Sequence, residues 1–99
     1  MALPSYEAIA SQYAKSVATV QTLTGLGFTQ AQIDSADQLL LTVEGAAIRY
    51  TIDGTTATTS VGHPAAIGAT LTFNGRFLFS GIQIIGTGAT VNATLERYV

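Results

Sequence analysis

The chain of 99 residues contains no cysteine and few charged side chains. The absence of cysteine excludes disulfide bonds and thiolate chemistry, both in a metal site and as a nucleophile. Charged residues make up 10% of the sequence, against roughly 25% in an average soluble domain. The net charge of −2 provides no basic surface of the kind that binds nucleic acid or anionic lipid. We therefore expect neither nucleic acid nor a membrane surface as a partner.

Long hydrophobic runs are also absent. No stretch approaches the ~20 apolar residues that a helix needs to cross a bilayer, so no transmembrane segment is expected. No apolar signal-peptide region follows the N-terminus, and the first positive charge is Lys15, so we expect no secretion. Hydrophobic residues nevertheless make up 47% of the sequence. That proportion excludes a disordered chain, and the length fits one domain.

The polar positions are filled mostly by threonine, alanine, glycine and glutamine instead of charged residues. A neutral polar surface can be buried against a neighbouring protein without leaving unpaired charges behind. The composition therefore favours a protein that assembles with other subunits. The alternative is a small soluble domain with a neutral surface.

The first quarter of the chain has a helical pattern. Apolar residues recur at spacings of three or four, which places them on one face of a helix. Pro4 and Ser5 suit a helix start. We predict a helix within residues 5–21, whose apolar stripe packs either on the chain's own β-domain or on a neighbouring subunit. This stripe is the candidate interaction site and consists of Tyr6, Ile9, Tyr13, Val17 and Val20.

A short helical turn is predicted to follow. Thr29 and Gln32 have the spacing of a capping box, and Phe28 and Ile33 flank them at the spacing of a hydrophobic staple. The turn is expected to be short, because the residues after Ile33 favour caps and turns.

Beyond Gln38 the pattern changes to strands. Apolar residues alternate with threonine and other polar residues, and turn sequences separate the runs. Asn74-Gly75 is typical of a type I′ hairpin turn. We predict a mainly β fold: a small antiparallel β-sandwich (Ig-like) over residues 38–99, preceded by an N-terminal helical arm and short capped turn over residues 1–37. The residues predicted to form its core are Leu41, Val43, Ile48, Tyr50, Ile52, Leu71, Phe73, Ile84, Val91 and Leu95.

The sequence contains no recognisable set of catalytic, cofactor-binding or metal-binding residues. His63 is the only histidine, and without zinc partners it is interpreted as a turn residue. Asp34 and Asp37 lack the spacing of a calcium loop. No serine lies in a nucleophile elbow. We therefore predict that the protein is not an enzyme and uses no cofactor.

One segment resembles a known family. Residues 48–60, IRYTIDGTTATTS, resemble the strand–turn–strand of chitobiase-type C-terminal sandwich modules, although Ala57 stands in place of the usual proline. The wider run from Leu39 to Leu95, with TVEG, IRYTIDGT, SVGH and GATLTFNG, is similar to small virion proteins of tailed bacteriophages. In residues 48–60, the positions that match the chitobiase-type modules are Tyr50, Thr51, Asp53, Gly54, Thr55, Thr58 and Ser60.

The same motif also has a physical interpretation that needs no family. The Asp53 carboxylate can accept hydrogen bonds from backbone groups beyond Gly54, and Gly54 can adopt a positive φ. The match is therefore open to a second explanation, namely that it reports only a well-formed sandwich turn.

Two classes of function remain open. The resemblance implies a non-enzymatic structural protein of a phage virion, such as a capsid decoration or cement protein, or a small head–tail or tail protein. Such a protein is expected to be a homo-oligomer, to bind the major capsid protein or other virion proteins, and to reside in the virion after synthesis in the host cytoplasm. The alternative is a carbohydrate-adjacent binding module, which would need an exposed aromatic platform or a polar groove.

Overall fold

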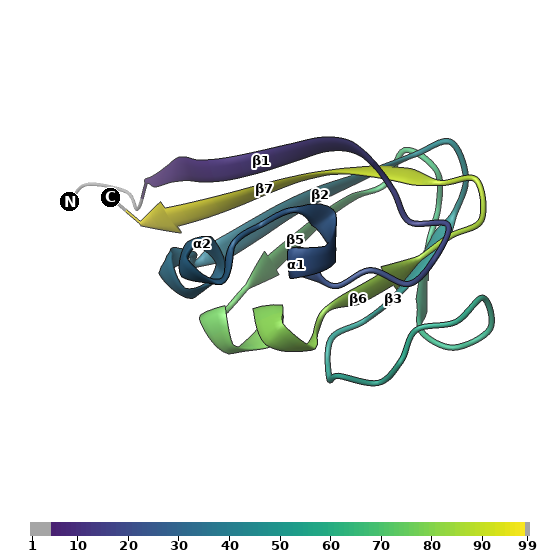
Figure 1. Ribbon diagram of the computed structural model, residues 1–99. Helices are drawn as coiled ribbons and strands as arrows, with labels where there is room; N and C mark the ends of the chain where they lie inside the picture. Colours follow the sequence, from purple (N-terminus) through teal and green to yellow (C-terminus); the bar gives the residue numbers. More distant parts are fainter. Residues whose placement is uncertain (1–4, 99) are drawn as a thin grey trace.

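Alternating apolar side chains give the chain two antiparallel sheets that share a buried layer (Figure 1). The computed structural model describes residues 5–98, except for the side chains of residues 76–78. One sheet has the strand order β1-β7-β2-β5 and the other β4-β3-β6. The predicted mainly β, antiparallel, sandwich-like fold is confirmed. The strands are β1 (Tyr6–Ser16), β2 (Gln38–Glu44), β3 (Ile48–Thr51), β4 (His63–Ala65), β5 (Thr70–Asn74), β6 (Gln83–Ile85) and β7 (Thr90–Tyr98).

The prediction of an N-terminal helix is wrong, because residues 6–16 form β1, which pairs with β7. The register shifts between Ala8 and Ala10 and again between Gln12 and Lys15. Each shift inserts unpaired residues into the strand. They interrupt the simple alternation of a strand, so this segment lacks the period of two that marks the later strands. Pairing with β7 thus decides the structure of a segment whose local pattern is ambiguous.

The five residues of the predicted stripe consequently do not share one face. Val17 is completely buried, and Ile9 packs partly against the core. The Tyr6 ring stacks on Tyr98, with the ring centroids 4.7 Å apart. Tyr13 and Val20 are 68% and 39% exposed. A single apolar stripe for a neighbouring subunit is therefore absent from this segment.

Two short helices, α1 (Leu23–Leu26) and α2 (Gln30–Ser35), connect β1 to β2. The helix α2 lies toward the end of the molecule that carries the two termini, and α1 lies nearer the middle (Figure 1). The predicted capped turn is confirmed in α2. The Gln32 amide donates to Thr29 Oγ1 over 3.2 Å, and the Thr29 amide donates to Gln32 Oε1 over 2.9 Å. Both predicted staple residues, Phe28 and Ile33, are buried.

The predicted hairpin turn at Asn74-Gly75 is wrong. Asn74 ends β5, and the chain then enters a 3-10 helix, η1 (Arg76–Gly81). A type I′ turn needs a positive φ at both central residues, but Gly75 has φ +116 and Asn74 has no positive φ. The helix places Phe79 in the core near α2, and Ile82, directly after it, is also buried. Burial of these two large apolar side chains explains why the chain does not turn back directly.

The core confirms most of the predicted residues. Four of the ten (Tyr50, Ile52, Leu71 and Phe73) are only half-buried, although they pack against the core. Leu71 and Phe73 lie on β5, which is the last strand of its sheet and therefore has a neighbour on only one side. Helical residues that the strand pattern could not include complete the core. They are Leu23, Leu26 and Ile33.

Candidate functional site

The outward side of the larger sheet is uncharged at its centre. Leu39, Leu41 and Val43 of β2 are buried, so the alternate residues of β2 face outward. The strand register extends these residues into two rows across the sheet, and neither row contains a charged side chain. We call these two rows the outer face. It consists of Ser11, Thr94, Leu40 and Thr72 in one row, and of Asn92, Thr42 and Thr70 in the other. Tyr13, which lies in the second register shift of β1, borders the same hollow as these rows and completes the outer face.

Asn92 organises this outer face by bonding to both neighbouring strands. Its Oδ1 accepts the Ala14 amide of β1 over 2.8 Å. Its Nδ2 donates to Thr42 Oγ1 over 3.2 Å and to Glu44 Oε1 over 2.7 Å, both on β2. Much of the hydrogen-bonding capacity of the face is therefore satisfied within the protein. Burying the outer face against another surface would leave few polar groups without a hydrogen-bond partner.

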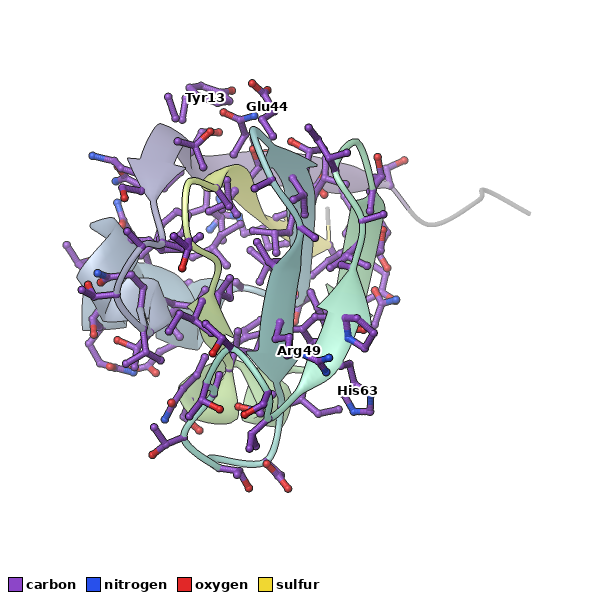
Figure 2. The ribbon with its side chains drawn as sticks, turned by 90° about the vertical axis from the view of Figure 1, so that its right-hand side faces the viewer. Tyr13, Glu44, Arg49 and His63 are labelled. Carbon is purple, nitrogen blue, oxygen red and sulfur yellow. The ribbon has the colours of Figure 1, made fainter. Side chains whose placement is uncertain are left out.

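Tyr13 projects from a strained bulge in β1. Ala14 has φ +53, the only positive φ at a non-glycine residue among those described. That conformation costs roughly 1–2 kcal/mol for an L-residue, and the bond from Ala14 to Asn92 helps to hold it. Beside Tyr13 lies a shallow hollow of about 540 Å³. Figure 2 shows Tyr13 at the same end of the molecule as Glu44. The hollow is lined by Tyr13, Leu40, Thr42, Asn92 and Thr94.

Replacing Asn92 with alanine is expected to lower the free energy of unfolding by about 1–2 kcal/mol, because the variant loses bonds to both flanking strands. Urea unfolding measures this change. The matched control is Asn74→Ala, at an exposed asparagine that ends β5, where we expect a change within about 0.5 kcal/mol. Equal effects of the two variants would contradict the organising role of Asn92.

A second hollow, of about 550 Å³, lies beside the loop that connects β3 to β4. Arg49 of β3 holds this loop, since its Nε donates to the Thr59 carbonyl over 3.1 Å and its Nη1 to the Gly62 carbonyl over 2.8 Å. Figure 2 shows Arg49 and His63 close together on this side of the molecule. The lining residues are Thr51, Ile52, Asp53, Thr55, Val61, Gly62 and His63.

The Asp-Gly-Thr motif forms the turn that its physical interpretation predicts. The Thr55 amide donates to Asp53 Oδ1 over 3.0 Å, and Gly54 has φ +85. The hydrogen bond from the Thr55 amide lowers the pKa of Asp53, and a smaller contribution comes from the Thr55 side chain. The motif thus has a local structural role, whatever its origin.

Acid is expected to weaken this turn slightly. Because the folded pKa of Asp53 lies below its ordinary value of 3.8, the carboxylate contributes its full stability above that value and loses it as the pH falls through the folded pKa. The effect is small, since the group is exposed to solvent. An NMR titration of Asp53 measures the folded pKa, and Thr55→Pro, which removes the donating amide, should raise it. A wild-type midpoint at or above the ordinary value would contradict the assignment.

The residues considered for metal or acid–base chemistry lie apart. His63 begins β4 at the surface, with its ring 5.4 Å from that of Tyr50. Asp34 accepts the Gln30 side-chain amide within α2, and Asp37 Oδ2 accepts the Tyr98 amide. Within residues 5–98, no three histidine, aspartate or glutamate side chains gather closely enough to hold a metal ion. No sequence pattern distinguishes Asn92, because an outward-facing asparagine in a strand resembles any other polar position.

Comparison with known proteins yields no relative: no family model matches the chain, nor does any curated protein or solved structure. In the part of the chain that the structure describes, no helix has the length and apolar character needed to cross a bilayer.

Proposed function

We propose that this protein is a non-enzymatic structural protein that binds a larger protein assembly through its outer face. The observation that carries the proposal is the uncharged centre of that face, with the exposed Tyr13 beside a hollow. Tyrosine is enriched among the residues that dominate binding energy, because it offers a large rigid contact area with a polar end. The flanking threonines provide neutral contact area that costs little to dehydrate.

The proposed assembly is a phage virion, with the protein as a capsid decoration or cement protein and the major capsid protein as its partner. The choice rests on the sequence pattern alone, because the segments between Leu39 and Leu95 resemble those of small tailed-phage virion proteins. A cement protein binds only the assembled shell, and its binding therefore stabilises that shell by mass action. A head–tail or tail protein is the alternative within the same class, since it would use the same kind of face.

A binding module is the second candidate, and the hollow beside the loop after β3 favours it. This hollow combines the Asp53 carboxylate and the Thr55 hydroxyl with the apolar side chains of Ile52 and Val61. Tyr50 and His63 lie in ring contact next to it. Such a mixture of polar and apolar groups suits a carbohydrate.

The test compares phage particles that carry the protein with particles from which its gene is deleted. We expect particles that lack the protein to be less resistant to heat and to chelator. We expect mass spectrometry to count many copies of the protein in complete particles. Equal resistance of the two kinds of particle would contradict cementing. A copy number that matches a single tail ring would favour the tail alternative.

Point variants then test the outer face itself. Tyr13→Glu places a charge on this face, beside the hollow, and should abolish rebinding of the purified protein to particles that lack it. The matched control is Ile67→Glu, at a side chain that is similarly exposed (61% against 68%) but lies outside the outer face. Loss of binding in the control, or binding by Tyr13→Glu, would contradict the assignment of this face.

A further inference from the structure

The two sheets have four edges, and three of them are protected against pairing with another strand. Edge strands commonly avoid such pairing through bulges, proline or a covering segment. β1 is interrupted by two register shifts. β4 contains Pro64, which has no backbone N–H to donate. β6 is covered by Gln21, whose amide and carbonyl both bond to Ile84, over 2.8 and 2.9 Å.

In the part of the chain that the structure describes, the fourth edge, β5, has none of these protections. Its five residues, Thr70–Asn74, pair with β2 without any register shift. The strand contains no proline and no charged side chain. Thr70, Thr72 and Asn74 are exposed, while Leu71 and Phe73 on its other side are only half-buried. A regular, neutral edge strand with partly exposed apolar side chains is the kind of edge that accepts a further strand.

We infer that β5 pairs antiparallel with β5 of a second copy of this chain. The strand is self-complementary about its central residue, Thr72. A twofold axis at Thr72 places Leu71 of each copy opposite Phe73 of the other, on the side that faces the core. It also places Thr70 opposite Asn74 on the outward side. No like charges oppose one another, and each apolar pair covers side chains that one copy alone leaves half-exposed.

The neighbourhood of β5 supports the same partner. Phe73 already meets Tyr50 of the other sheet edge-to-face, with ring centroids 5.4 Å apart. A second Leu71 beside Phe73 would extend this contact. Five residues per strand form a small interface, so we expect a dimer that depends on protein concentration.

The resulting dimer has one continuous sheet of eight strands, with its two outer faces side by side. This inference does not depend on the proposed function. The dimer forms through the backbone edge of β5, whereas the outer face binds through side chains, although Thr70 and Thr72 belong to both. If the chain dimerises and also binds an assembly through its outer face, the dimer presents two outer faces to that assembly. It then binds more tightly than a single copy does.

Sedimentation velocity from micromolar to millimolar concentration tests the inference. We expect wild type to shift from monomer to dimer, and Thr72→Lys to remain monomeric, because the two lysines would meet at the axis. Thr55→Lys changes an exposed threonine in the loop after β3 and is the matched control, which should dimerise as wild type does. Tyr13→Glu should also dimerise, although it disables the outer face.

Hydrogen exchange of wild type supplies a readout that needs no variant. Backbone amides of β5 are expected to gain protection as concentration rises, whereas amides of β1 stay unchanged. Three results would overturn the inference: a monomer at every concentration, a dimer that survives in folded Thr72→Lys, or a gain of protection confined to β1. Dissociation by Tyr13→Glu alone would instead assign the dimer contact to the outer face and also overturn it.

Discussion

Replacing Phe79 with alanine is expected to lower the free energy of unfolding by about 3–5 kcal/mol. Phe79 is the largest of the fully buried side chains, with 1% of its surface exposed. It lies in η1, which contacts α2, and it borders a small hollow together with Leu23 and Ile33. Truncation leaves a cavity between helices and sheets that cannot collapse without moving both. Urea unfolding measures the loss.

Phe73→Ala is the matched control for this experiment. Alternation along β5 predicts Phe73 as a core residue, but the structure leaves it half-buried at the sheet edge. We therefore expect a smaller loss, of about 1–2 kcal/mol, because less apolar area returns to water. A cost for Phe79→Ala no greater than that for Phe73→Ala would contradict the role of η1 in closing the core.

Deleting residues 1–24 is expected to abolish cooperative unfolding. The deletion removes β1, which pairs along most of β7, and it removes the fully buried side chains of Val17 and Leu23. The edge of β7 would become exposed, and the loss of these side chains would leave the core open to water. Circular dichroism during thermal unfolding measures the outcome.

The control for the deletion is Tyr13→Ala, which keeps β1 but removes its most exposed aromatic side chain. A change within about 0.5 kcal/mol is expected for this variant. A deleted chain that still unfolds cooperatively would contradict the integration of β1 into the sheet. That result would instead support a separable N-terminal arm.

The sequence predicts those elements whose pattern is local. The alternation in β2 and β7 identifies their buried faces, because apolar residues at every second position are typical of a strand with one buried face. The capping box at Thr29 and Gln32 places α2, since both hydrogen bonds form within four residues. The Asp53 turn is predictable for the same reason.

The features that the sequence does not predict depend on distant partners. The register shifts of β1 form in its pairing with β7, and they interrupt the alternation that would mark a strand. The Asn74-Gly75 pair favours a hairpin locally, but the burial of Phe79 and Ile82 selects a 3-10 helix. The outer face is likewise invisible in the sequence, because its two rows draw residues from four strands.

The place of β7 between β1 and β2 has a consequence for biosynthesis. β1 leaves the ribosome well before its partner strand β7: Ser11 and Thr94, which share a hydrogen bond, are 83 positions apart. Until β7 emerges, the larger sheet can form only its β2–β5 pair. Pairing between such distant strands loses the conformational entropy of the intervening chain before any contact between them forms. This entropy loss slows folding. The nascent chain should therefore remain largely unfolded, and open to chaperones and proteases, until the last strand is synthesised.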